Sequence, residues 1–159
     1  MKKKQQRDET IKITRGISPK SGGPDRDFYR VDAYIHLVSG LVPHEERTNL
    51  SSRVLPSTPV SSWAPETMKR VDISGAGIAF DSEDFYSTGD IVALKIMFNK
   101  DWAVPLLVYG EVMRVEPYRR YCRVAVKFVS VSSRVKSIIM RFVFERERDI
   151  IAEKRVGWL

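Results

Sequence analysis

Six short extended segments, separated by turn-forming residues, run along this 159-residue chain, and in 29–37, 92–98 and 122–128 apolar side chains recur at every second position. A period of two is typical of a β-strand with one buried face. After the sixth segment the spacing becomes helical, with Ser132 or Ser133 available as the N-cap. We therefore predict a mainly β fold, a six-stranded antiparallel β-barrel with a C-terminal α-helix at about 133–154. The predicted strands lie within 29–37, 71–73, 78–80, 92–98, 104–115 and 122–128.

Charge and turn-forming residues divide the chain into an arm and a folded domain. The formal net charge is +7, and residues 1–25 carry +4 of it. Because this segment is basic and contains Ser-Gly-Gly-Pro at 21–24, we predict a flexible N-terminal arm, either solvated or folding onto something anionic. The barrel domain is expected at 26–155.

One long stretch inside the expected domain lacks any periodicity. Residues 39–67 are rich in Ser, Thr, Pro and charged residues. We predict that they form a long surface loop, which Leu55 and Trp63 attach to the barrel.

Composition gives no support to a membrane protein, a metalloprotein or an enzyme. No stretch approaches the length of a membrane span, and the basic start leads into no apolar signal segment, so we expect a cytoplasmic protein without membrane insertion. Cys122 is the only cysteine and His36 and His44 are the only histidines, so we expect no disulfide framework and no metal site. Cys122 is in phase with its apolar neighbours and is expected to be a small buried hydrophobe. With no recognisable nucleophile–base pair or Gly-rich phosphate loop, we predict no catalytic residue and no cofactor.

Two short motifs carry chemistry that suits a guanine nucleotide. Arg26 and Arg30 form an RxxxR pattern where the arm enters the first predicted strand. Arginine presents a planar fork that binds phosphate oxygens bidentately and stacks on aromatic bases. Asp72, Ser74 and Gly77 form a DxSxxG pattern at the turn between the second and third predicted strands. Asp72 can accept hydrogen bonds from the N–H edge of guanine, the Ser74 hydroxyl can donate or accept, and Gly77 lets backbone amides approach a ligand.

Each motif alone also has a purely structural explanation. Two arginines at a strand start can be solvated charges, and a second RxxxR occurs at Arg119 and Arg123. Asp, Ser and Gly are residues that turns prefer. The order and placement of the two motifs favour a joint site, in which a mobile arm clamps a ligand against a rigid turn.

With these motifs the chain resembles the PilZ domain family, whose hallmarks are an RxxxR and then a [D/N]xSxxG on a six-stranded barrel with a C-terminal helix. The resemblance extends from about 26 to 155. Residues 89–94 are similar to the "GDxVxL" strand of the family, and 110–112 resemble its "GxV". Residues 126–128 match its "GxxF" strand except that Ala125 stands at the glycine position, which we expect in the barrel interior.

The resemblance implies a bacterial receptor that binds cyclic di-GMP through a five-residue set and signals to a protein effector. The implied ligand-binding residues are Arg26, Arg30, Asp72, Ser74 and Gly77. Two alternatives stay open: a degenerate PilZ protein that acts only through protein contacts, and a basic small barrel that binds nucleic acid through aromatic and basic side chains. Nucleic acid is the less favoured partner, because only +3 of the net charge lies outside the arm. The side chains that would serve it are Tyr29, Tyr34, Tyr118, Arg119, Arg120 and Tyr121.

Overall fold

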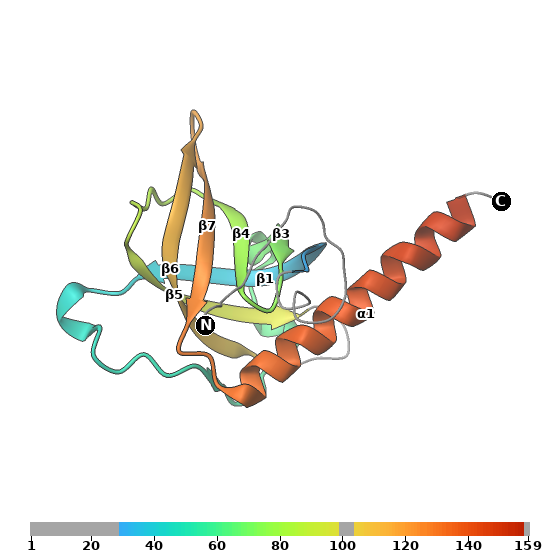
Figure 1. The fold of residues 1–159 in the computed structure, drawn as a ribbon, viewed down its shortest axis with the longest axis horizontal. Coiled ribbons are helices and arrows are strands. Elements are labelled where there is room, and N and C mark those ends of the chain that lie inside the picture. The colour runs from blue at the N-terminus through green and yellow to red at the C-terminus, as the bar shows by residue number, and fades with distance from the viewer. Residues whose placement is uncertain (1–28, 99–103, 158–159) are drawn as a thin grey trace, which may run out of the picture.

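A computed structural model describes residues 29–98 and 104–157, and in them it shows seven β-strands followed by one long α-helix (Figure 1). The six predicted strands and the predicted helix are present, and the seventh strand lies in the segment expected to be a loop. The predicted arm lies outside the described residues. The elements are β1 (Val31–Leu41), β2 (Arg53–Val54), β3 (Met68–Ile73), β4 (Gly77–Ser82), β5 (Ile91–Phe98), β6 (Leu106–Pro117), β7 (Cys122–Val129) and α1 (Ser133–Gly157).

Six of the strands close into an antiparallel barrel, as predicted. The order in the sheet is β2-β6-β5-β1-β3-β4-β7, and β6 also pairs with β7, which closes the barrel. Two long strands allow this closure because each changes its neighbour along its length. β1 pairs with β3 through 31–36 and with β5 through 35–41. β6 pairs with β5 through 106–111 and with β7 through 109–117.

Strand β2 lies outside the barrel, where it pairs with the first two residues of β6. These two residues come before the residues of β6 that pair with β7, so β2 covers an edge of β6 that β7 does not reach. Next to β2, the backbone N–H of Leu55 donates to the carbonyl oxygen of Pro105 (2.9 Å). The ring of Trp63 lies 5.6 Å from that of His36 in β1. Through these contacts Leu55 and Trp63 attach the segment 39–67 to the barrel, as expected. The rest of it contains three single-turn 3₁₀ helices, η2 (His44–Glu46), η3 (Val60–Ser62) and η4 (Pro65–Thr67).

The barrel interior is filled by the inward-facing residues of the alternating pattern. Cys122 is among them and is fully buried, which confirms its interpretation as a buried hydrophobe. The largest fully buried side chains include Phe80, Phe98, Ile35, Leu37 and Leu94.

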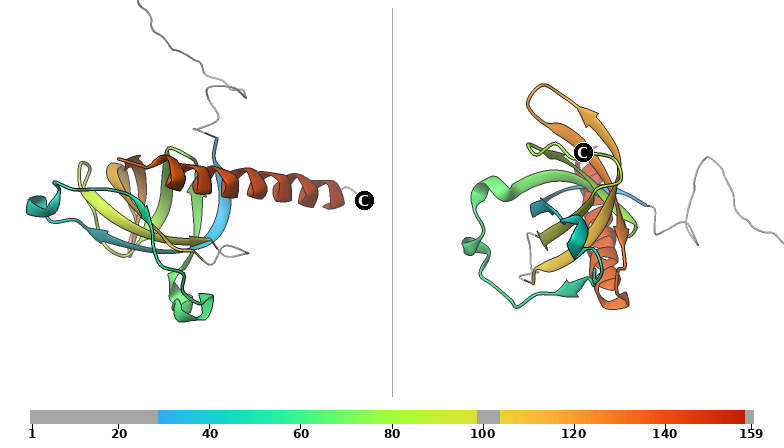
Figure 2. Two further views of the ribbon diagram at one scale, coloured as in Figure 1. Left: turned by 90° about the horizontal axis from the view of Figure 1, so that it is seen from below. Right: turned by 90° about the vertical axis from the view of Figure 1, so that its left-hand side faces the viewer.

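Helix α1 packs against the barrel through its N-terminal half. Ser132 is its N-cap, because the hydroxyl accepts a hydrogen bond from the backbone N–H of Val135 (3.2 Å). Phe142 stacks on Phe98 at the end of β5, with the ring centroids 4.1 Å apart and the planes at 9°. Residues 151–156 are exposed, and Figure 2 shows this end of the helix extending past the barrel. No helix in the described part of the chain is long and apolar enough to cross a membrane.

Replacing Phe142 by Ala removes the ring that stacks on Phe98 and leaves a cavity between helix and barrel. We expect the free energy of unfolding, measured by chemical denaturation, to fall by about 3 kcal/mol. Ile151→Ala, in the exposed end of the same helix, is the control and should change this free energy by less than about 0.5 kcal/mol. Equal effects of the two substitutions would contradict this account of how α1 is held.

Candidate ligand-binding site

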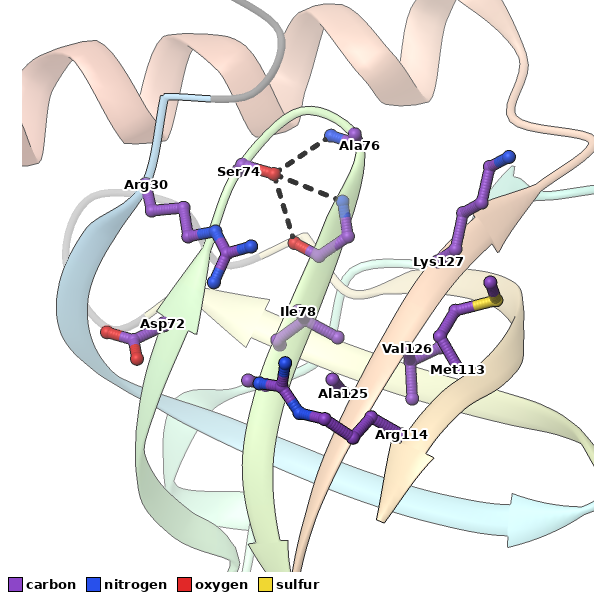
Figure 3. A pocket seen from close by; sticks show the side chains of 12 residues that line it. Arg30, Asp72, Ser74, Ala76, Ile78, Met113, Arg114, Ala125, Val126 and Lys127 are labelled. Carbon is purple, nitrogen blue, oxygen red and sulfur yellow. Dashed lines mark hydrogen bonds between the residues drawn. The ribbon is translucent and has the colours of Figure 1, made fainter. Parts of the chain in front are cut away.

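A pocket of about 430 Å³ opens on the outer face of the barrel. Small-molecule sites typically measure about 300–1,000 Å³. Figure 3 shows the pocket lying across β3, β4, β7 and β6, beside the segment that leads into β1. Four of the five predicted ligand-binding residues line it, and the fifth, Arg26, lies outside the described residues. The four are Arg30, Asp72, Ser74 and Gly77.

The hydroxyl of Ser74 builds the turn between β3 and β4. It accepts hydrogen bonds from the backbone N–H groups of Ala76 (3.1 Å) and Gly77 (3.2 Å), and it donates to the carbonyl oxygen of Gly77 (3.4 Å) (Figure 3). A hydroxyl has one donor and two acceptor positions, and these contacts occupy all three. Ser74 is also only 5% exposed. The geometry therefore favours a positioning role for Ser74 over the direct ligand contact that the sequence suggested.

Gly77 lies at a position where β4 packs closely against β7. A Cβ at this position would overlap the backbone carbonyl oxygen of Val126. Glycine is required here for lack of space and not for its backbone conformation, because the φ of Gly77 lies outside the left-handed region. A backbone hydrogen bond also joins the turn to β7, because the N–H of Phe128 donates to the carbonyl oxygen of Ala76 (2.9 Å). Gly77 thus allows β4 and β7 to pack together in the wall of the pocket.

Asp72 lies at one side of the pocket, and an arginine of β7 orients its carboxylate. Arg123 donates from Nη2 to Oδ2 of Asp72 (3.1 Å) and from Nη1 to Oδ1 of Asp81 (3.2 Å). The side chain of Asp72 remains 43% exposed. Its Oδ1 has no hydrogen-bond partner among the described residues, so the carboxylate is fixed in place and can still accept hydrogen bonds.

A second carboxylate lies directly opposite Asp72 in the neighbouring strand but is fully engaged. Asp32 of β1 pairs in register with Asp72. Both of its oxygens accept hydrogen bonds from Arg70, at 2.8 Å from Nε to Oδ1 and 2.8 Å from Nη2 to Oδ2. The hydrogen bonds from Arg70 are the main reason why the pKa of the Asp32 carboxyl is lowered from its usual value. Asp72 is therefore the carboxylate of this pair that is available to a ligand.

Helix α1 holds the chain on both sides of Arg30. Tyr29 is hydrogen-bonded to Glu147, and partial burial together with this bond raises the pKa of the Tyr29 phenol. On the other side, Arg146 donates from Nε to the carbonyl oxygen of Asp32 (2.9 Å). These contacts fix the short segment from which Arg30 extends toward the pocket (Figure 3).

A β-bulge in β6 adds two residues to the pocket that sequence reasoning missed. The register between β6 and β7 shifts between Val112 and Arg114. Met113 is therefore an extra residue, and both Met113 and Arg114 are exposed and line the pocket. The signal was present in the sequence, because the inward-facing positions change phase between Val112 and Val115.

Ala125 lines the pocket as well, so its expected place in the barrel interior is wrong. It is half-exposed, while its neighbours Val124 and Val126 are buried. The strict alternation along β7 already puts Ala125 on the outer face.

Positive charge predominates around the pocket. Arg30, Arg114 and Lys127 line it, and none of the three forms an ion pair with another residue in 29–98 or 104–157. Lys127 lies opposite Glu111 in the strand register, whereas Arg114 lies opposite Ala125. Asp72 is already paired with Arg123. Such a pocket attracts an anion.

The aromatic residues of the nucleic-acid alternative lie in separate parts of the molecule. Tyr118 and Tyr121 stack on each other at the β6–β7 turn, with centroids 4.9 Å apart, so each has one face covered. Tyr29 lies beside α1, and Tyr34 is exposed on β1. None of these four tyrosines lines the pocket.

Comparisons with known proteins agree with this architecture. The family model of the PilZ domain matches residues 43–145, which is more than half of the chain. Among solved structures, the chain is similar to the Bacillus subtilis inhibitor of motility (MotI/DgrA), with a TM-score of 0.51 and 14% identity. That match covers 76% of this chain and 49% of the other, so the chain spans about half the length of that protein. No curated protein sequence matches significantly.

Replacing Gly77 by Ala tests the close approach of β4 to β7. We expect the free energy of unfolding to fall by about 1–3 kcal/mol, because the backbone of β7 must move to admit the methyl group. Gly40→Ala is the matched control, since a Cβ there meets no atom within 4 Å. Chemical denaturation of both variants measures the difference. A Gly77→Ala variant as stable as Gly40→Ala would show that β4 and β7 accommodate the methyl group without loss of stability.

Proposed function

The chain belongs to the PilZ domain family, and on this premise we propose that it is a receptor that binds cyclic di-GMP and carries out no chemistry on it. PilZ domains bind this ligand and act on protein partners. The observation that carries the proposal for this chain is the meeting of Arg30 with the Asp72–Gly77 turn at one positively charged pocket.

The position of Arg30 supports the proposal independently of the family match. The matched region begins at residue 43, so it contains the DxSxxG motif but neither arginine of the RxxxR motif. Arg30 nevertheless lines the same pocket as Asp72 and Gly77. The arginine of the second RxxxR differs from it, because Arg123 is already paired with two carboxylates, Asp72 and Asp81, whereas Arg30 forms no ion pair with another described residue.

In the proposed complex each motif has its own task. Arg26 and Arg30 bind the phosphates, for which a guanidinium is a bidentate donor. Asp72 accepts hydrogen bonds from the guanine N–H groups, and Ser74 and Gly77 hold the turn in the shape that keeps Asp72 in place. Binding orders the arm against the barrel, and the surface so created contacts a protein effector in the cytoplasm.

Calorimetric titration with cyclic di-GMP tests the receptor role. We expect selective binding of this ligand over cyclic GMP and over a short single-stranded oligonucleotide. Arg30→Ala and Asp72→Ala should each weaken binding by about 10- to 150-fold, the loss expected for a hydrogen bond to a charged group. Arg119→Ala and Glu83→Ala remove the same charges from exposed positions outside the pocket and should leave binding unchanged.

Any other outcome of the titration would contradict the receptor proposal or favour one of the two alternative functions. A folded wild-type chain that binds no cyclic di-GMP at high micromolar concentration would refute the receptor proposal. Binding of the oligonucleotide instead would favour the nucleic-acid alternative, and binding of neither would favour action through protein contacts alone.

Hydrogen exchange tests the ordering of the arm separately. We expect saturating cyclic di-GMP to slow amide exchange in residues 20–30, because the phosphates fix Arg26 and Arg30 on the barrel. The exposed segment 44–46 lies outside the pocket and should exchange equally fast with and without ligand. Unchanged exchange in 20–30, despite calorimetric binding, would leave the receptor role in place and refute ordering of the arm.

A further inference from the structure

The strand registers align four pocket residues in one row across the barrel face. Asp72 of β3 pairs with Ala79 of β4, Ala79 pairs with Ala125 of β7, and Ala125 pairs with Arg114 of β6. All four line the pocket. The row therefore has an acceptor at one end, a cation at the other and two methyl groups between them.

The two alanines make a flat floor between these ends. Both are half-buried, and their side chains are the smallest that still cover the strands. Because neighbouring strands lie about 4.8 Å apart, the backbones of Asp72 and Arg114 are separated by about 14 Å. Figure 3 shows the side chain of Arg114 crossing β7 past Ala125 toward Ile78 of β4, so its planar guanidinium lies over the floor.

Arg114 differs from the paired arginines near the pocket. Arg123 binds Asp72 and Asp81, and Arg70 binds Asp32. Arg114 forms no ion pair or hydrogen bond with another described residue that would hold it there. The bulge at Met113 is what turns it onto this face.

We propose that the guanidinium of Arg114 is the platform on which a guanine base stacks, with the N–H edge of that base directed at Asp72. This inference rests on the proposed function and assigns a base-binding role to a residue outside both motifs. A guanidinium stacks well on an aromatic ring because it is planar, delocalised and weakly hydrated. The guanidinium of Arg114 lies over the row between β7 and β4, so roughly one strand spacing separates it from Asp72. This separation matches the distance from the centre of a stacked base to its hydrogen-bonding edge.

Substitutions that separate planarity from charge test this role. Arg114→Tyr keeps a planar group and removes the charge, whereas Arg114→Lys keeps the charge and removes the plane. If the base stacks on Arg114, the Tyr variant should bind cyclic di-GMP within about threefold of wild type. The Lys and Ala variants should bind about 5- to 150-fold more weakly, the range measured for loss of base stacking. Calorimetry measures the affinities, and Arg119→Ala, on the exposed hairpin turn, controls for the loss of one positive charge.

A nuclear magnetic resonance readout reports on stacking without relying on affinity. In the saturated complex of wild type, the guanine H8 proton should show nuclear Overhauser contacts to the side-chain protons of Arg114, and in Arg114→Tyr it should shift upfield under the ring current of the tyrosine. The saturated complex of Arg114→Lys should lack the upfield shift and show weaker contacts. Because Arg114 is exposed, all variants should keep the wild-type denaturation midpoint, which confirms that they are folded.

The outcomes distinguish this inference from the proposed function. Retained affinity in Arg114→Lys with loss in Arg114→Tyr would make Arg114 a phosphate contact and refute stacking. Loss in both variants would assign it a hydrogen-bonding role and also refute stacking. Unchanged affinity in all three variants would remove Arg114 from the site while leaving the receptor role intact. Absence of any binding by wild type would refute both.

Discussion

At Gly77 the carbonyl oxygen of Val126 occupies the space that a Cβ would need, and the pairing of β4 with β7 begins at this contact. Because Gly77 has no side chain, the regular antiparallel register of β4 with β7, which runs from Gly77 to Ser82, can begin at this position. The same contact fixes the turn that follows β3, whose hydroxyl network is internal to Ser74, Ala76 and Gly77. The pocket wall and the β4–β7 pairing thus depend on the same contact, so a substitution that opens one also distorts the other.

Charge on the outer face is distributed so that one carboxylate and two arginines stay available. Asp32 and Asp72 are cross-strand neighbours, and two like charges side by side are unfavourable unless each has a cation. Arg70 binds Asp32 through both oxygens, whereas Arg123 binds Asp72 through one and uses its other nitrogen on Asp81. The difference between bidentate and single-point pairing leaves Asp72 as an oriented acceptor.

The sequence predicted the regular elements well and the irregular ones poorly. Period-two alternation and one change to helical spacing were enough for six strands, the helix and the closed barrel, because these depend on burial of one face. Strand β2 was missed, since a two-residue strand is formed by its pairing with β6 and has no pattern of its own. The DxSxxG motif and Arg30 lie at one pocket, and their role in ligand binding stays a prediction. Arg114 was missed because the bulge at Met113 reverses which side chains point outward, and Ala125 was misplaced although its alternation was readable.

The contacts around Arg30 connect the pocket to helix α1. The segment before β1 carries Arg30 between two attachment points, the bond from Tyr29 to Glu147 and the bond from Arg146 to the Asp32 carbonyl. Both attachments come from consecutive residues of α1, shortly before the exposed end of the helix at 151–156, which extends past the barrel in Figure 1. A ligand that pulls Arg30 toward the pocket floor must therefore either preserve these bonds or act on the helix through them. In the first case the ligand meets a site that is largely formed in advance, and in the second the exposed end of α1 is the surface best placed to respond.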